Sequence, residues 1–332
     1  MLYAGVDLHR RFLVVAVEDE AGKEVAMRQF SCEAVQEIKA FFSGLSPFRA
    51  VIEASSSYRW LYDLISVHGQ VVLAHPYRLR AIVAGRAKTD KLDARLLAKL
   101  LRAGLIPTAY IPPVDYQALR DLARARARLS REATHAKNEL HALLGRANLH
   151  SPYANVFCQR GRRWIAEQGL APVARGIGDE LLRRLAHFES EISRVDAELR
   201  EMSDHFPEAE ALTILYGIGL YSALLIIGEL GEPWRFGASR QVGAYAGLTA
   251  RVTQSGSSCR HGSISRQGSP WLRWILVEAA MKLVRQDRQL GNFYQRIRKR
   301  SGAKIARVAA ARKLAEICWK RLMRWHGEHP AA

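Results

Sequence analysis

The first 75 residues contain a succession of short apolar runs, and these runs limit the fold more than any other feature of the chain. Residues 2–7, 12–17 and 24–30 alternate or run apolar, with turn residues between the second and third runs. Such a pattern predicts two or three antiparallel strands joined by hairpins. The chain therefore begins with a sheet.

Helical and strand patterns alternate after this hairpin region. Residues 33–44 and 58–68 are typical of helices, whereas 49–55 and 70–75 are typical of strands. Residues 88–101 predict a further helix, with leucines 92, 96, 97, 100 and 101 on one apolar side. Strands first, then helices alternating with strands, favour an α/β domain built on a mixed sheet.

Four carboxylates occupy the ends of these elements. Asp7 interrupts the first strand, Glu53 ends a later strand, and Asp90 and Asp93 share one face at a helix start. Asp90 and Asp93 can also be explained as cap residues of a helix whose N-cap is Thr89 or Asp90, and Asp7 as a strand-end residue in a turn with His9.

Convergence of these four carboxylates would require a cation. Four carboxylates at one point cannot all stay ionised without one, and oxygen-only ligands favour Mg²⁺ or Mn²⁺. Two such ions would stabilise the attacking and leaving oxygens of a phosphodiester.

The charge of the chain points to a polyanionic partner. The 332 residues carry a formal net charge of +18, and residues 201–332 hold 20 of the basic side chains against 10 acidic ones. Nucleic acid is the expected partner. We expect no membrane span and no signal peptide. The four scattered cysteines support neither a disulfide framework nor a zinc ribbon, so a reducing cytoplasm fits.

The middle of the chain predicts two long helices after a proline-bearing linker at residues 105–114. The apolar residues of the second helix repeat in heptads, which argues for a coiled-coil hairpin or an oligomer seam. These residues are Leu181, Leu185, Phe188, Ile192, Val195, Leu199 and Met202. The first is rich in arginine, which suits either a solvated face or contact with phosphates. The segment 145–178 between them is not assigned a structure.

The last third combines a glycine turn, a serine-rich segment and a basic tail. Tyr216-Gly-Ile-Gly219 joins two apolar helices and is similar to the helix-hairpin-helix element of DNA-binding proteins, although a plain helix–helix turn is the simpler reading. Serines, glycines and arginines fill residues 251–269, as in a surface loop or a phosphate-handling site. Residues 294–324 predict a helical, strongly basic tail.

The order Asp7, Glu53, Asp90, Asp93 resembles the D-E-D-D pattern of RNase-H-like, RuvC-type nuclease domains. Together with the basic helices, the Gly-Ile-Gly turn, Ala-Gly-Leu-Thr-x-Arg and Ser255-Gly-Ser-Ser, the chain resembles the IS110 family of bacterial transposases, to which Piv-type DNA invertases are related. The resemblance implies a RuvC-like domain over residues 1–106, a linker and coiled coil over 107–205, and a mainly α C-terminal transposase domain over 206–332.

The resemblance also implies an activity and its partners. We expect site-specific recombination of double-stranded donor and target DNA, guided by an element-encoded non-coding (bridge or seeker) RNA, in a dimer or tetramer with composite active sites. The nucleophile is expected to be Ser255, with Ser257 and Ser258 as alternatives, acting with the Mg²⁺ (or Mn²⁺) cluster. Basic residues expected to contact nucleic acid are Arg78, Arg80, Arg86, Lys88, Arg120, Arg124, Arg128, Arg251, Arg260, Arg266, Arg296, Arg298, Lys299, Arg300 and Lys304.

Three other functions remain open at this stage. The chain could be a metal-only nuclease or junction resolvase whose serine segment only grips phosphate. It could be a non-enzymatic nucleic-acid-binding protein whose acids are structural, or a protein-only invertase that needs no RNA.

Overall fold

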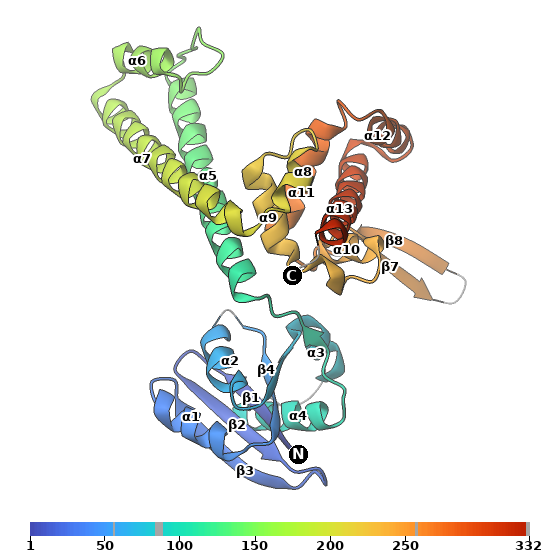
Figure 1. Ribbon diagram of the computed structural model, residues 1–332. Helices are drawn as coiled ribbons and strands as arrows, with labels where there is room; N and C mark the ends of the chain where they lie inside the picture. Colours follow the sequence, from blue (N-terminus) through green and yellow to red (C-terminus); the bar gives the residue numbers. More distant parts are fainter. Residues whose placement is uncertain (56, 84–88, 256–257, 330–332) are drawn as a thin grey trace. The chain divides into compact units, whose positions relative to one another are not determined.

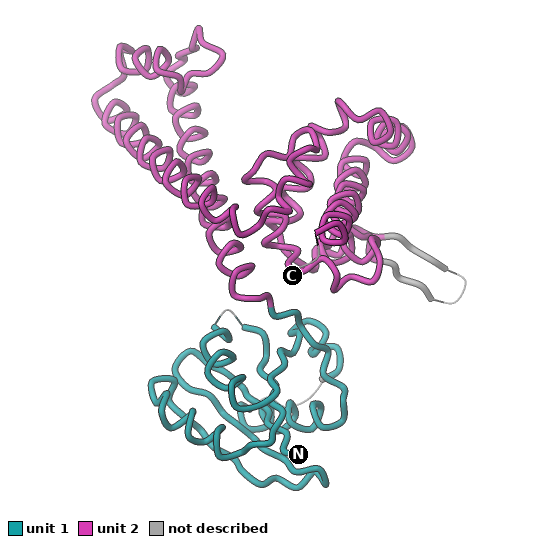
Figure 2. The backbone as a smooth tube through the Cα atoms, viewed as in Figure 1, with its two compact units in different colours: residues 1–111 teal, residues 112–332 magenta. Residues whose placement is uncertain are grey.

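The computed structural model describes residues 1–55, 57–83, 89–255 and 258–329, with the backbone alone at 83, 252–255 and 258–261. The chain forms two compact units, residues 1–111 and 112–332 (Figure 2). Within the described residues, every helix is too short or too polar to cross a membrane.

Unit 1 is built on a six-stranded sheet with the order β3-β2-β1-β4-β5-β6. Strand β1 pairs antiparallel with β2 and parallel with β4, so the sheet is mixed, as the sequence predicts. The strands are β1 (Leu2–Leu8), β2 (Phe12–Glu18), β3 (Glu24–Ser31), β4 (Phe48–Glu53), β5 (Gln70–Ala74) and β6 (Thr108–Ala109).

Four helices accompany this sheet (Figure 1). They are α1 (Val35–Gly44), α2 (Arg59–Ser66), α3 (Pro76–Val83) and α4 (Asp90–Arg102). The apolar spacing predicts no helix in the basic segment that forms α3. Leu92, expected on the apolar side of α4, is 44% exposed, because the helix buries Ala94, Leu97 and Ala98 instead.

The two faces of the sheet pack against different helices because successive side chains of a strand point to opposite sides. Val6 of β1 and Ile52 of β4 belong to the same apolar cluster as Ile38 of α1 and Leu61 of α2. Val51, the neighbour of Ile52, packs instead with α4 through Leu97, Leu100 and Leu101. Side chains at odd positions of β1 and β4 therefore face α4.

A long helical hairpin opens unit 2 (Figure 1). Helices α5 (Val114–Arg146) and α7 (Pro172–Met202) pack along each other, and α6 (Gln159–Glu167) lies at the far end of the pair. Four of the heptad positions of α7 are buried, namely Leu181, Leu185, Val195 and Leu199. The two predicted long helices are confirmed, and their supercoiling stays a prediction.

The rest of unit 2 is a mainly helical body around one large apolar core. Its elements are η1 (Ser203–His205), α8 (Ala209–Thr213), α9 (Leu220–Leu230), η2 (Pro233–Arg235), α10 (Ser239–Tyr245), β7 (Ala250–Ser255), β8 (Ser258–Ile264), α11 (Pro270–Leu283), α12 (Arg288–Ser301) and α13 (Ala303–Glu328).

One expectation for this region is wrong and one is confirmed with a break. The described part of the serine-rich segment forms an antiparallel pair of strands, β7 and β8, rather than a loop. The basic tail is helical, as predicted, but it is divided into two helices because Gly302 between α12 and α13 adopts φ +85° and ends the first of them. Glycine reaches this backbone conformation at little cost, which makes it a frequent helix terminator.

Candidate active site

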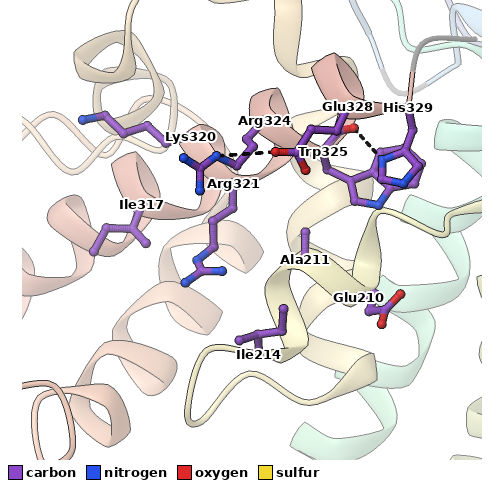
Figure 3. A pocket seen from close by; sticks show the side chains of 10 residues that line it. All are labelled: Glu210, Ala211, Ile214, Ile317, Lys320, Arg321, Arg324, Trp325, Glu328 and His329. Carbon is purple, nitrogen blue, oxygen red and sulfur yellow. Dashed lines mark hydrogen bonds and ion pairs between the residues drawn. The ribbon is translucent and has the colours of Figure 1, made fainter.

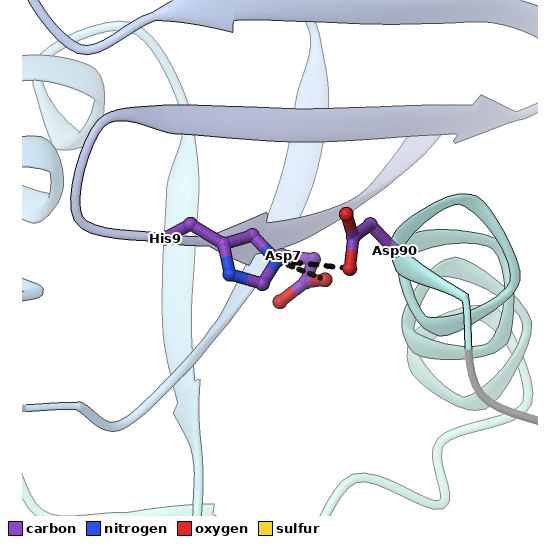
Figure 4. A group of neighbouring side chains, drawn as sticks. All are labelled: Asp7, His9 and Asp90. Atoms are coloured by element: carbon purple, nitrogen blue, oxygen red, sulfur yellow. Dashed lines mark hydrogen bonds and ion pairs between the residues drawn. The ribbon is translucent and has the colours of Figure 1, made fainter.

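Asp7 and Asp90 meet around the imidazole of His9 (Figure 4). The Nε2 atom of His9 lies 3.0 Å from Oδ2 of Asp7 and 3.2 Å from Oδ1 of Asp90. One ligand atom from each of the three residues falls within 4.8 Å of the other two. A strand end and a helix start, more than 80 positions apart in sequence, therefore supply one polar cluster.

The close approach of α4 to β1 produces this meeting. A methyl group added at Gly5 would overlap the backbone carbonyl of Ala94 and the backbone amide of Ala98, so the helix lies directly on the strand there. The hydroxyl of Thr89 accepts a hydrogen bond from the amide of Leu92 and caps α4. The cap makes Asp90 the first residue of the helix, next to the end of β1.

Glu53 and Asp93 lie on the same side of the sheet as Asp7. Val6 of β1 is paired with Ile52 of β4, so Asp7 and Glu53 follow at the next position of two parallel strands. Both are at odd positions, and they therefore face α4. Asp93 is half-buried in the first turn of α4, where its negative charge acts on Asp7.

The surroundings of Asp7 disfavour its negative charge. Burial is the largest factor that raises the pKa of this carboxyl, and the charges of Asp90 and Asp93 raise it further. The hydrogen bond and the charge of His9 act in the opposite direction. A cation in this position would offset both the burial and the repulsion between carboxylates.

These residues fit a hard divalent cation. The carboxylates of Asp7 and Asp90, one from a strand and one from a helix, converge with the imidazole of His9, and burial followed by carboxylate repulsion raises the pKa of Asp7 there. Oxygen donors of this kind are the preferred ligands of Mg²⁺ and Mn²⁺. Metal binding by Asp7, Glu53, Asp90 and Asp93 remains a prediction.

His9 belongs to the same cluster, although the acidic pattern in the sequence does not include it. Its ring stacks on Phe12 with the ring centroids 4.6 Å apart, which fixes the imidazole between the two carboxylates. The spacing Asp7-x-His9 at the end of a strand was the available signal, because residues two apart on a strand share a face.

The predicted nucleophile lies in the other unit. Ser255 is the last residue of β7, and its backbone is paired with that of Ser258 on β8. Gly256 and Ser257 lie outside the described residues, as do the side chains of Ser255, Ser258 and Arg260.

Arginine side chains surround the base of the β7–β8 pair. The guanidinium of Arg251 donates to the carbonyl of Ser265 at 3.2 Å, and Arg266 is exposed with φ +53°. Arg273 donates to the carbonyl of Gly268, and burial followed by the charge of Arg266 lowers its pKa. Two arginines close enough to repel each other form a position that attracts anions. Arg273 is therefore a further candidate for phosphate contact, beyond the residues predicted from the sequence.

The other basic residues fall into three groups. Exposed side chains are those of Arg78, Arg80, Arg128, Arg296, Arg298, Lys299, Arg300 and Lys304, whereas Arg86 and Lys88 lie outside the described residues. Arg120 donates instead to the carbonyl of Gly228, and Arg124 pairs with the carboxylate of Glu229. These last two side chains therefore hold α5 to α9.

Comparisons with known proteins agree with this arrangement of acidic and basic segments. Residues 4–148 match the DEDD transposase model of the IS110 group, and residues 209–295 match the transposase IS116/IS110/IS902 family model. These two matches define the class of protein as a transposase, an enzyme of DNA recombination and transposition.

Related proteins extend the likeness along the chain. A probable family 20 transposase of Pseudomonas aeruginosa is 28% identical, over 96% of each chain. The transposase for insertion sequence element IS1328 of Yersinia enterocolitica is 26% identical over 95% of each. The pilin gene-inverting protein of Moraxella bovis is 26% identical over 74% of this chain and 70% of its own. The chain belongs to the IS110 family of transposases.

Proposed function

We propose that this transposase cuts and rejoins DNA through a serine nucleophile, assisted by a divalent metal ion held by Asp7, Glu53, Asp90 and Asp93. The main support for this proposal is the convergence of Asp7 and Asp90. Their carboxylate oxygens lie 3.0 and 3.2 Å, respectively, from the same Nε2 atom of His9. Acidic groups brought together from separate elements at the cost of mutual repulsion are typical of metal sites.

The fold of unit 1 supports the same proposal. An antiparallel β1–β2–β3 region followed by the parallel strands β4 and β5 is the arrangement expected of an RNase-H-like, RuvC-type domain. Such a domain places its first acid on the central strand, where Asp7 lies. The match to the DEDD transposase model over residues 4–148 covers all four acids.

The chemistry assigns separate tasks to the two units. The hydroxyl oxygen of Ser255 attacks phosphorus, a phosphoserine bond forms, the bond to one deoxyribose oxygen breaks, and that oxygen takes up a proton. Serine is a weak nucleophile until its proton is removed. A divalent ion bound by the four acids would supply positive charge at the attacking and leaving oxygens.

Arginines at the base of the same pair of strands complete this scheme. Arg251, Arg266 and Arg273 lie at the end of β7 and β8 away from Ser255, where their charge can hold DNA that flanks the attacked phosphate. Because one phosphoester is exchanged for another, the strand can be rejoined by the reverse reaction. The serine segment of one subunit and the acids of another would then form a composite site in a dimer or tetramer.

A guide RNA is the second part of the proposal. The net charge of +18 supports binding of nucleic acid, and the resemblance to the IS110 family implies a structured RNA that pairs with donor and target DNA. Exposed basic residues on α3, α12 and the start of α13 are available for backbone contacts.

The covalent intermediate gives a direct test. Purified chain with its RNA, Mn²⁺ and end-labelled DNA should form a protein–DNA adduct that survives denaturing gel electrophoresis. Ser255→Ala should abolish the adduct, Asp7→Asn should abolish both adduct and cleavage, and Ser43→Ala, an exposed serine on α1, should change neither. Cleavage that persists in Ser255→Ala would instead identify a metal-only nuclease.

A protein-only invertase is the alternative that the pilin gene-inverting relative favours. Sequencing of RNA that copurifies with the chain separates the two. Recombination of the same DNA substrate after nuclease removal of all RNA would support the invertase.

A further inference from the structure

A cavity of about 640 Å³ lies in unit 2 between α8 and the last turns of α13 (Figure 3). Its volume falls within the range of about 300–1,000 Å³ that is usual for ligand sites. Neither the acidic cluster nor the serine segment contributes to it.

The α13 side of this cavity is basic. Lys320, Arg321 and Arg324 all line it, and Figure 3 shows the side chain of Arg321 extending from α13 toward α8. Arg324 is paired with Glu328 at 3.8 Å. Lys320 and Arg321 have no acidic partner within 4.0 Å among the described residues, although Arg321 is half-buried. Their charge is therefore free to meet an anion.

Flat and apolar groups provide the rest of the lining. The indole of Trp325 stacks on the imidazole of His329, with ring centroids 4.6 Å apart and planes 14° apart. Ile214 is 69% exposed and lies on the α8 side of the cavity. An exposed isoleucine, an aromatic pair and two unpaired cations therefore line the same cavity.

We propose that this cavity binds an unpaired nucleotide of a nucleic-acid strand. Phosphates would meet Lys320 and Arg321, and a base would stack against Trp325 or pack on Ile214. A positive groove combined with aromatic faces is the usual means of holding single strands without sequence preference. Glu210, the carboxylate on the α8 side, can accept a hydrogen bond from a base amino group. The site is independent of the metal site proposed above.

Unpaired nucleotides occur in loops of a structured RNA and in opened DNA, and binding measurements can separate these sources. Full-length protein is titrated into labelled oligo-U, oligo-dT and a duplex of the same length, with fluorescence anisotropy as the readout. We expect single strands to bind more tightly than the duplex at this site. A preference for oligo-U identifies RNA as the source, and a preference for oligo-dT identifies DNA.

Variants locate the binding. Trp325→Ala should weaken single-strand binding roughly 5- to 150-fold, the range expected for one lost stacking contact, whereas Trp325→Phe should retain most of the affinity. The double change Lys320→Ala with Arg321→Ala should reduce the salt dependence by about 0.7 per lost phosphate contact. Lys313→Ala removes an exposed lysine two turns earlier on α13 and is the matched control.

Three results would overturn the proposal. The first is equal weakening by Lys313→Ala and by the double change, which would show only a general effect of charge. The second is unchanged single-strand binding by all cavity variants. The third is a change of oligomeric state in those variants with normal nucleic-acid binding, which would make the cavity a contact between copies of the chain. Photocrosslinking of a 4-thiouridine or 5-iododeoxyuridine strand to Trp325 in the unaltered chain gives a readout that does not depend on a variant folding.

Discussion

The backbone of Gly5 on β1 lies directly against the backbone of Ala94 on α4. A Cβ atom at position 5 would overlap the carbonyl oxygen of Ala94 and would lie 2.9 Å from Cβ of Leu97. The absence of a side chain at this one position lets the helix sit low enough for Asp90 to reach the same point as Asp7. The acidic site thus depends on a glycine that carries no chemistry of its own.

Gly5→Ala should destabilise unit 1 and separate the acids. The obstructing atoms belong to the backbone and cannot rotate away. We therefore expect a loss of folding free energy of at least about 1–3 kcal/mol, the usual cost of overpacking. Urea unfolding followed by circular dichroism measures it. Gly44→Ala is the control, because nothing lies within 4 Å of its added Cβ, and it should be neutral or gain up to about 1 kcal/mol. Equal stability of the two variants would contradict this account.

Arg124→Ala should destabilise unit 2. The guanidinium donates from Nε to Oε1 of Glu229 at 2.6 Å and from Nη2 to Oε2 at 2.9 Å, and Glu229 is 1% exposed. Removal of the arginine leaves a buried carboxylate without its partner, which costs about 3–5 kcal/mol. Thermal unfolding of the variant measures the loss.

Arg128→Ala is the matched control for that prediction. Arg128 lies one turn further along α5, is exposed, and has no acidic partner among the described residues. Its loss should change stability by less than about 0.5 kcal/mol. Weaker DNA binding with unchanged stability in Arg128→Ala, and the reverse in Arg124→Ala, would separate the two roles of arginine on α5.

The sequence predicted those features of the chain that depend on near neighbours. Alternating apolar residues were enough for β1 to β5, and Thr89 with its leucines was enough for α4. Meetings between distant segments were harder to infer. Arg124 looked available for phosphate because its partner Glu229 is 105 positions away. The role of His9 cannot be inferred from its neighbours in sequence, because only the folded chain brings Asp90 to its ring.

Composition concealed two further features. The serines and glycines of residues 251–269 suggested a loop, although β7 and β8 need only backbone hydrogen bonds to pair. The basic tail had a continuous helical pattern, and Gly302 was too weak a signal in the sequence to divide it. In both places backbone conformation, rather than hydrophobic spacing, determined the structure.

Glu208→Gln should stabilise the protein relative to the unaltered chain, and this stabilisation should be larger at neutral pH than at acid pH. Glu208 is 4% exposed, and burial raises the pKa of its carboxyl, while the hydroxyl of Tyr116 donates to it at 3.5 Å. The folded chain therefore holds this proton more tightly than the unfolded chain. Ionisation costs stability as pH rises from the ordinary value of 4.5 through the raised value.

Glutamine cannot ionise and avoids that cost. The stability difference between Glu208→Gln and the unaltered chain should be smallest below pH 4.5 and should grow, in favour of the variant, as pH rises through the folded pKa. Chemical unfolding at a series of pH values measures this difference. A variant that loses stability most at high pH would show that Glu208 is stabilised as a carboxylate.

Divalent metal should stabilise the folded chain against heat. A ligand that binds only the folded state adds about 2.7 kcal/mol when it is present at 100 times its Kd. Mn²⁺ and Mg²⁺ should therefore raise the unfolding temperature of the unaltered chain, because their positive charge offsets the burial and repulsion that raise the pKa of Asp7.

Asp7→Asn and Asp90→Asn should each lose this increase in unfolding temperature. Their stability without metal should stay the same or improve, since each variant removes one repelling charge. Asp63→Asn, which alters an exposed carboxylate paired with Arg59 on α2, should keep it. If metal raises the unfolding temperature equally in all three variants, it binds elsewhere. If metal does not raise the unfolding temperature of the unaltered chain, the basis for a metal site at Asp7 is removed.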